Sequence, residues 1–213
     1  MKINNRAGLF ALVLGVAVSA GLVINSVVQR AEAETDAAKT TTHAEAIFAG
    51  GCFWCMEPPY DKVDGVIATI SGYTDGHKEN PTYKEVSSGT TGHTEAIKIT
   101  YDPSKVSYEQ LLDIFWRNID PVTPNRQFCD GGTQYRSGIY YLDDTQQQLA
   151  EKSKAAIEQS GVLSKAIVTE IKPASTFYPA EEYHQDYYLK NPVRYKFYRY
   201  NCGRDQRLEE IWG

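Results

Sequence analysis

Sulfur-containing residues are few in this chain of 213 residues, which has four cysteines and two methionines. Cys52 and Cys55 form one C-x-x-C pair, but the other two cysteines are isolated, so the second pair of ligands that a structural zinc site needs is missing. Clusters of Lys and Arg are also missing, and the net charge of −5 argues against nucleic-acid binding. We therefore expect neither a metal site nor a nucleic-acid partner.

Charged residues are missing from residues 7–28, which follow Lys2 and Arg6. This run reaches the length of about 20 apolar residues that a membrane-spanning helix requires. Residues 18–20, Val-Ser-Ala, fit the small-residue cleavage site of a signal peptide. The run thus predicts either a cleaved signal or a membrane anchor.

The sequence is divided accordingly into three parts. Residues 1–33 are expected to be the signal peptide or membrane anchor, and residues 34–43 an acidic, Thr/Ala-rich linker. Residues 44–213 have the ordinary hydrophobic content of one folded domain. Because the positive charges stay on the cytoplasmic side, we expect this domain to be exported, either periplasmic or anchored and facing outside the cytoplasm.

Strand-like and helix-like segments interleave along this domain. Residues 93–101 alternate in polarity, which is typical of a strand with one covered face. This pattern favours a single-domain, two-layer α+β sandwich over a doubly wound parallel sheet. Residues 192–204 are expected to be irregular. The predicted strands are residues 44–49, 66–73, 93–101, 137–142 and 166–171, and the predicted helices are 53–63, 108–118, 144–159, 181–189 and 205–212.

The most informative segment is Gly-Gly-Cys-Phe-Trp at residues 50–54. A cysteine at the start of a helix meets free backbone N–H groups and the positive end of the helix dipole, which favour its thiolate. Paired glycines indicate close backbone approach or unusual dihedral angles. The segment predicts a nucleophilic Cys52 beside an apolar pocket of Phe53 and Trp54, the alternative being a cysteine buried in the core.

Glu95 is an acidic residue near the start of an otherwise apolar-faced strand. An inward-facing glutamate has its pKa raised by burial and can donate a proton near neutral pH, whereas an outward-facing one is simply solvated. The chain has fifteen tyrosines, seven of them crowded into residues 178–200, and a tyrosine hydroxyl in a pocket is a good donor for a developing negative charge.

Four motifs in this order resemble the A-type peptide methionine sulfoxide reductases, and the resemblance covers about residues 44 to 200. They are G-C-F-W at 51–54, Y-x-x-V-x-x-G-x-T-G-H-x-E at 83–95, G-T-Q-Y-R-S at 132–137 after Asp130, and the segment 179–188 with His184 and Gln185. The resemblance implies a ferredoxin-like two-layer α+β sandwich. It also implies reduction of the S epimer of methionine sulfoxide, free or in a polypeptide, without a metal or organic cofactor.

In this family resemblance, Cys52 attacks the sulfoxide sulfur as a thiolate and becomes a sulfenic acid. Glu95 protonates the sulfoxide oxygen, and methionine leaves. The remaining roles are implied in the same way: Phe53 and Trp54 hold the S-methyl group, Tyr83 and Tyr135 donate hydrogen bonds to the oxygen, and Asp130 orients the set.

The chain departs from the family pattern in its other cysteines. Many members have glycine at the position of Cys55 and carry recycling cysteines in a glycine-rich tail, which is missing here. We rank Cys202 first as the resolving cysteine because a mobile tail could reach the pocket. Cys55 comes second, because C-x-x-C permits a disulfide, and Cys129 third.

The resemblance implies that a thioredoxin-type dithiol protein returns the electrons, and export would require a donor relayed through the membrane. The competing enzyme hypothesis is a general thiol–disulfide oxidoreductase that uses Cys52 and Cys55. A non-enzymatic hypothesis is an exported binding module whose cysteines only pack.

Overall fold

The computed structural model describes residues 43–213, so the signal or anchor predicted for residues 1–33 lies outside the described residues, as does nearly all of the predicted linker. Within residues 43–213, none of the helices combines the length and the apolar character needed to cross a membrane.

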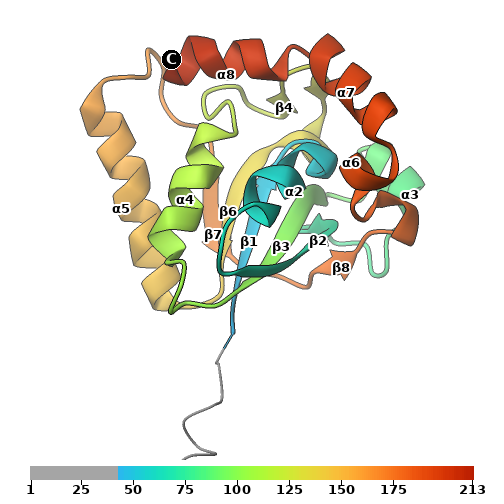
Figure 1. Ribbon diagram of the computed structural model, residues 1–213, viewed down its shortest axis with the longest axis horizontal. Coiled ribbons are helices and arrows are strands. Elements are labelled where there is room, and N and C mark those ends of the chain that lie inside the picture. Colours follow the sequence, from blue (N-terminus) through green and yellow to red (C-terminus); the bar gives the residue numbers. More distant parts are fainter. Residues whose placement is uncertain (1–42) are drawn as a thin grey trace, which may run out of the picture. The chain divides into compact units, whose positions relative to one another are not determined.

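A mixed sheet forms the centre of this domain (Figure 1). Its six strands lie in the order β7-β6-β1-β3-β2-β8, and all neighbours are antiparallel except β6 and β7. β1 is therefore central, with β3 and β6 on its two sides. The strands are β1 (Ala44–Gly50), β2 (Val66–Thr74), β3 (Thr94–Tyr101), β6 (Ser137–Tyr141), β7 (Glu170–Pro173) and β8 (Tyr178–Pro179).

Two helices, α2 (Phe53–Asp61) and α4 (Tyr108–Arg117), lie against one face of the sheet (Figure 1). A third helix, α5 (Asp144–Ser160), packs beside α4 along the edge that β6 and β7 form. The side chains between the sheet and these helices form a buried apolar core, and removal of their surface from water stabilises the fold. Its main members are Phe48, Ile97, Ile99 and Ile139 from the strands and Met56, Tyr60, Leu111, Leu112 and Phe115 from the helices.

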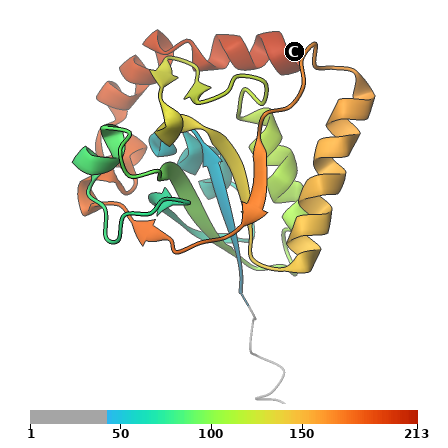
Figure 2. The same ribbon diagram turned by 180° about the vertical axis from the view of Figure 1, so that it is seen from behind.

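On the opposite face, the segment that connects β7 to β8 crosses the lower end of the sheet (Figure 2). Ala174 and Phe177 of this segment pack on Ile47 and Tyr140 of the sheet. A separate two-stranded sheet, β4 (Arg126–Gln127) with β5 (Asp130–Gly131), and the short helices α3 (Tyr83–Ser87) and η1 (Thr133–Tyr135) lie in the connections.

Local sequence signals account for the bounds of α4 and α5. The Ser107 hydroxyl accepts from the backbone N–H of Gln110, and the Gln110 side chain accepts from the Ser107 N–H, which is a complete capping box. At the start of α5 the Asp143 side chain accepts from the backbone N–H of Gln146, and Gly161 ends the helix in the left-handed conformation with φ +68°. The helices predicted for residues 108–118 and 144–159 are thus confirmed to within one residue at each end.

The C-terminal part differs from the prediction in three places. The predicted helix 181–189 is divided into η2 (Glu182–His184) and α6 (Tyr187–Lys190) by Asp186, whose φ is +52°. The segment expected to be irregular contains helix α7 (Pro192–Asn201), which begins with proline at its first position. β7 begins at Glu170 rather than 166, because its bounds are set by parallel pairing with β6.

The last helix, α8 (Arg204–Trp212), is anchored by a buried arginine. Arg204 is 1% exposed, and its Nη2 donates to the backbone oxygens of Gly50 (3.2 Å) and Asn118 (2.6 Å). The same nitrogen lies 3.0 Å from Sδ of Met56, which is also 1% exposed. α8 is thereby tied to the turn that precedes Cys52.

Candidate active site

The turn between β1 and α2 presents Cys52 as the N-cap of α2. Gly51 has φ +78°, and a Cβ there would lie 2.4 Å from Cβ of Gln127, so only glycine fits both the dihedral angle and the space. The N–H of Cys55 donates to the Cys52 oxygen at 3.0 Å, which closes the first turn. The close approach predicted for the glycine pair is confirmed.

Cys52 and Cys55 are free thiols, and both are buried. Burial raises the pKa of Cys52 well above its ordinary value, and the neighbouring Cys55 and the charge of Glu95 raise it further. A hydrogen bond from Cys52 and the charges of Arg204 and Arg199 lower the pKa of Cys55 to about 6, against the effect of burial. Of the two thiols, Cys55 is therefore the more acidic, and burial opposes ionisation of Cys52, which the helix dipole favours.

Glu95 faces inward from β3 and is 2% exposed. Its Oε2 accepts the N–H of Phe53, the residue that follows Cys52, at 3.1 Å. Burial raises the pKa of Glu95 to about 8, and the charges of Asp130 and Cys55 act in the same direction. The carboxyl group is therefore protonated at neutral pH and lies beside the thiol pair, as the inward orientation predicts.

The indole of Trp54 is held between two residues of the C-terminal part. Its Nε1 donates to Nδ1 of His184 at 3.1 Å, and its ring stacks on Tyr187 with centroids 3.7 Å apart and planes 8° from parallel. His184 lies with its ring centroid 5.0 Å from that of Phe53. Phe53 and Trp54 thus form an apolar wall next to Cys52, fixed by residues 130 or more positions away.

Tyr83 lies with its ring centroid 4.3 Å from that of His184, and both Tyr83 and Tyr135 are close enough to Glu95 for its charge to raise their pKa. Burial raises the pKa of Tyr83 to about 12, and the negative charges of Glu95 and Cys52 add to the effect. Burial and Glu95 also raise the pKa of Tyr135. Both hydroxyls therefore stay protonated and can donate hydrogen bonds.

Asp130 lies next to these tyrosines and accepts a hydrogen bond from the hydroxyl of Tyr198 in α7. Burial raises the pKa of Asp130, and the bond from Tyr198 opposes that effect. Tyr198 in turn contacts Cys52 and Trp54.

The remaining cysteines, Cys129 and Cys202, form a disulfide that we call the outer disulfide. Cys129 is exposed and Cys202 is half-buried at the end of α7. With Asp130 they bring three potential ligand atoms within 4.8 Å, but sulfurs joined to each other are not thiolate ligands. The structure thus pairs two of the three cysteines considered for the resolving step with each other.

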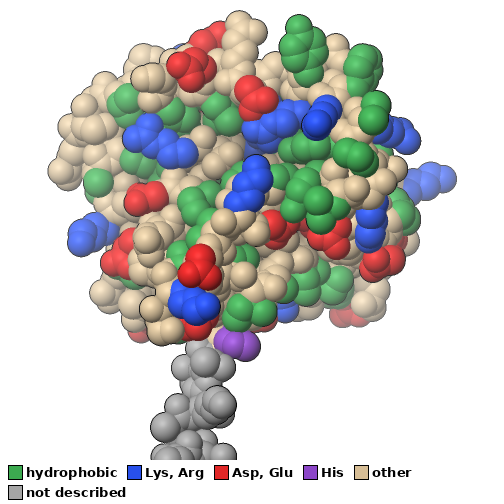
Figure 3. All heavy atoms as spheres, in the orientation of Figure 1, with side chains coloured by type: hydrophobic (Ala, Val, Ile, Leu, Met, Phe, Trp, Pro, Cys, Tyr) green, Lys and Arg blue, Asp and Glu red, His purple; other side chains and the backbone are tan. Residues whose placement is uncertain are grey.

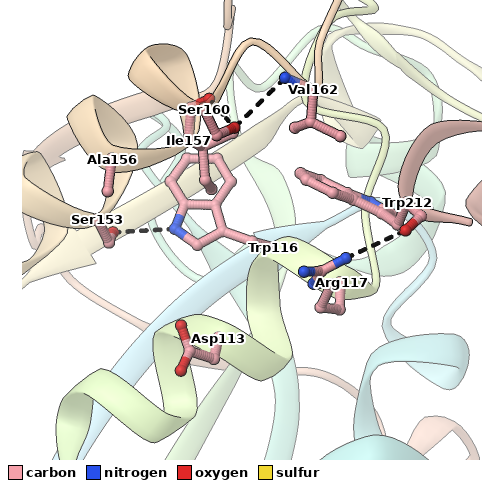
Figure 4. A pocket seen from close by; sticks show the side chains of 9 residues that line it. All are labelled: Asp113, Trp116, Arg117, Ser153, Ala156, Ile157, Ser160, Val162 and Trp212. Carbon is pink, nitrogen blue, oxygen red and sulfur yellow. Dashed lines mark hydrogen bonds between the residues drawn. The ribbon is translucent and has the colours of Figure 1, made fainter.

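A surface hollow of about 560 Å³ lies away from these groups, between α4, α5 and the end of α8 (Figure 4). Trp116 and Trp212 line it, and Trp116 Nε1 donates to Ser153 Oγ at 2.9 Å. No thiol lines it, so it takes no part in the chemistry of the cysteines.

Three of the residues that build the site were not singled out from the sequence: Tyr187, Tyr198 and Arg204. The crowding of tyrosines in the last third of the chain was the available signal, but it names no particular residue. Their positions follow from the packing of α6, α7 and α8 over the start of α2, which no local motif encodes.

A free thiol pair at a helix start, a protonated carboxyl group beside it and a disulfide at the edge together define a thiol-dependent oxidoreductase. A family model described as peptide methionine sulfoxide reductase matches residues 44–213. The chain belongs to this family, and its reaction is the thiol-dependent reduction of the S epimer of methionine sulfoxide to methionine.

Individual relatives agree with this assignment. The chain is 52% identical over 168 residues to peptide methionine sulfoxide reductase MsrA of Bacillus licheniformis, covering 79% of this chain and 93% of that protein. It is 54% identical to MsrA of Listeria monocytogenes serotype 4b, over 79% and 95% of the two chains.

Solved structures give the same family. Mxr1 from Saccharomyces cerevisiae in reduced form aligns with a TM-score of 0.66 at 35% identity, over 72% of this chain and 88% of that chain. Methionine sulfoxide reductase A of Corynebacterium diphtheriae aligns with a TM-score of 0.64 at 34% identity, over 72% and 77%.

Proposed function

We propose that Cys52 attacks the sulfoxide sulfur while Glu95 protonates the sulfoxide oxygen. The observation that carries this assignment is the buried Glu95, whose pKa burial raises to about 8 and whose Oε2 accepts the N–H of Phe53, the residue next to the Cys52 thiol. As Cys52 attacks, its proton passes to the Cys55 thiolate along the hydrogen bond that joins them. The oxygen moves to the Cys52 sulfur, which becomes a sulfenic acid, and methionine is released.

The other residues of the site bind and orient the substrate. Phe53 and Trp54 form the apolar contact for the S-methyl group, and Tyr83 and Tyr135 donate hydrogen bonds to the oxygen as negative charge develops on it. Asp130, bonded to Tyr198, holds the polar side of the pocket in place.

Two cysteine pairs then return the electrons in sequence. The Cys55 thiol displaces water from the Cys52 sulfenic acid and forms the inner disulfide, a step supported by the contact between the two side chains. The outer pair, when reduced, exchanges with this inner disulfide and is itself oxidised. The state with free inner thiols and an outer disulfide is the product of that exchange. Cys202, ranked first from the sequence, thus acts in the second step.

The electron donor in this proposal is a dithiol protein of thioredoxin type, and the chemistry of the site requires no metal or organic cofactor. The substrates are oxidised proteins and free methionine sulfoxide. The fold is assigned to the ferredoxin-like sandwich, supported by the chain order β1-α2-β2-β3-α4-β6 and the sheet order β6-β1-β3-β2.

Export of the domain rests on the sequence of residues 1–33, with residues 7–28 as the possible anchor. A fusion of the full chain to a reporter that is active only outside the cytoplasm tests it. Reporter activity that depends on residues 1–33 is the expected result, and equal activity without them would refute export.

The central experiment is reduction of separate S and R epimers of a methionine sulfoxide peptide with dithiothreitol as donor. Turnover of the S epimer alone, lost in Cys52→Ser, is the expected result. Cys55→Ser should still release one methionine per enzyme and leave a sulfenic acid on Cys52, but more slowly, because the acceptor of the Cys52 proton is gone. An unchanged rate of the first turnover in Cys55→Ser would show that Cys55 resolves the sulfenic acid without accepting that proton.

The C-x-x-C contact also favours a second candidate activity, thiol–disulfide exchange by Cys52 and Cys55. Glu95→Gln separates the two activities. It should cripple sulfoxide reduction and leave exchange with a model disulfide close to that of the unaltered chain, since exchange needs no proton donor to oxygen.

A further inference from the structure

The two sulfurs of the outer disulfide have different exposure. Cys129 lies in the exposed connection between β4 and β5, whereas Cys202 is half-buried at the junction of α7 and α8. A protein thiol, whose own backbone limits its approach, therefore meets Cys129 first.

The electrostatic surroundings of the two sulfurs also differ. The backbone N–H of Cys129 donates to Sγ of Cys202 at 3.3 Å. Sγ of Cys129 instead lies 3.6 Å from Oδ1 of Asp130. In thiol–disulfide exchange the attacking and leaving sulfurs carry the negative charge, and the central sulfur carries the least. A leaving thiolate is thus stabilised at Cys202 and repelled at Cys129.

A cation lies beside Cys129, and it also lines the hollow that reaches Cys202. Arg126 is exposed, and its Nη1 lies 3.4 Å from the backbone oxygen of Phe128 and 3.5 Å from that of Cys129. Among residues 43–213, no carboxylate forms an ion pair with Arg126. Its charge is available to an incoming thiolate.

We infer that the outer disulfide is polarised, so that an external dithiol protein of thioredoxin type attacks Sγ of Cys129 and Cys202 leaves. The external thiolate forms a bond to Cys129, the Cys129–Cys202 bond breaks, and the electron pair remains on Cys202. The second thiol of the donor then displaces Cys129, and the donor ends as a disulfide. This inference rests on the proposed role of the outer pair as the entry point for electrons.

A competing route reaches the same disulfide from the other side. A hollow of about 350 Å³ is lined by Cys202 and Gly203 with Arg126, Phe128 and Arg207, and it could lead a thiol to Cys202 instead. Asp120 also lines this hollow, and its carboxylate is paired with Arg207 at 2.9 Å. The two routes give different covalent products.

The experiment traps the first covalent product with the full chain in its outer-disulfide form. The probe is a bacterial thioredoxin whose resolving cysteine is replaced by serine, so that the mixed disulfide persists. Reactions are stopped at the earliest times with acid and then iodoacetamide, and tryptic peptides are mapped without reduction. Cleavage after arginine places Cys129 in residues 127–136 and Cys202 in residues 200–204, so the two products differ in mass.

Thioredoxin attached to residues 127–136, with Cys202 alkylated, is the expected result. Attachment to residues 200–204, with Cys129 alkylated, would overturn the inference. Failure of either adduct to form, while the same probe attacks a control disulfide, would overturn it as well. None of these outcomes depends on sulfoxide turnover with dithiothreitol, so the proposed function is judged separately.

A variant tests the part assigned to Arg126. Arg126→Gln should slow adduct formation about 3- to 10-fold at low ionic strength, and the difference should shrink at high salt. Lys165→Gln, which removes an exposed cation distant in sequence from the disulfide, is the matched control and should leave the rate within about 2-fold. Equal rates for the two variants would contradict the role of Arg126.

Discussion

At the scale of single residues, Glu95 is decisive because its protonation state sets the chemistry. Its pKa of about 8 keeps it a carboxylic acid at neutral pH, and it loses the proton as pH rises through that value. We therefore expect kcat for the S epimer to fall above about pH 8 while binding of the apolar S-methyl group changes little.

Glu95→Gln should lower kcat about 10²- to 10⁴-fold, the usual contribution of a positioned proton donor. The amide can still accept the Phe53 N–H, so the turn before α2 should be kept. Measurement of kcat across pH 6–9 checks both points, because the variant should lose the alkaline decline. A variant that kept that decline would show that another group is responsible.

His184 is expected to act on the substrate pocket through Trp54. Burial lowers its pKa, so Nδ1 is free to accept from the Trp54 indole at neutral pH. His184→Leu should release the indole and raise KM for methionine sulfoxide more than it lowers kcat. His184→Asn, whose side-chain oxygen can replace Nδ1, should recover much of the lost KM.

The readout for His184 is the split between KM and kcat. Similar losses for the leucine and asparagine variants would mean that His184 matters for packing alone. Acidification below the ordinary histidine pKa should weaken substrate binding in the unaltered chain, because a protonated Nδ1 cannot accept.

At the scale of elements, α8 is part of the site through Arg204. Arg204→Ala leaves the oxygens of Gly50 and Asn118 without their donor and opens a space against Met56. We expect the free energy of unfolding to fall by about 3 kcal/mol, as for other lost buried charged hydrogen bonds. Urea unfolding measures this change.

Arg194→Ala is the control for Arg204, since it removes an exposed arginine of α7 and should change the free energy of unfolding by less than about 0.5 kcal/mol. Loss of stability in both variants alike would show that α7 and α8 act by surface charge and not by the buried contacts.

The elements also show which parts of the fold a sequence can predict. α4 and α5 were predictable because their caps are local, in Ser107 and in Asp143 with Gly161. α7 was missed because its sequence has no apolar stripe at helical spacing that would pack on the core. In the structure its apolar residues Val193 and Phe197 are accordingly 82% and 72% exposed.

The residues of the active site also divide into those that the sequence could predict and those that it could not. Cys52 and Glu95 could be predicted because a local turn and a strand alternation place them, whereas the contacts of Trp54 could not. The stack on Tyr187 joins residues that approach only when the C-terminal helices fold over α2. The pairing of Cys129 with Cys202 is likewise a tertiary result, across 73 residues of chain.

At the scale of the whole molecule, buried acids shape the dependence of stability on pH. Burial raises the pKa of Glu57 to about 7 and that of Glu95 to about 8. The folded state therefore binds more protons than the unfolded state above about pH 4.5, and stability is lost as pH rises through these values. Asp75 and Glu181, with lowered pKa, act oppositely and lose their contribution as pH falls below about 4.

We therefore expect the free energy of unfolding to be greatest in mildly acidic solution and to decline toward pH 8. Glu57→Gln keeps an acceptor for the Ser71 hydroxyl and removes one of the buried acids whose raised pKa causes the decline, so the decline should be shallower. Urea unfolding from pH 4.5 to 8.5 checks this, and an unchanged slope in the variant would contradict it.

Met56 has a consequence for the conditions under which such an enzyme works. It is the one methionine in residues 43–213, and it is 1% exposed beneath Arg204. Oxidants that convert accessible methionines to sulfoxides reach buried thioethers slowly. The described part of this methionine-repairing enzyme thus has no exposed methionine of its own. Peroxide that oxidises methionines of its substrate proteins should leave Met56 unmodified.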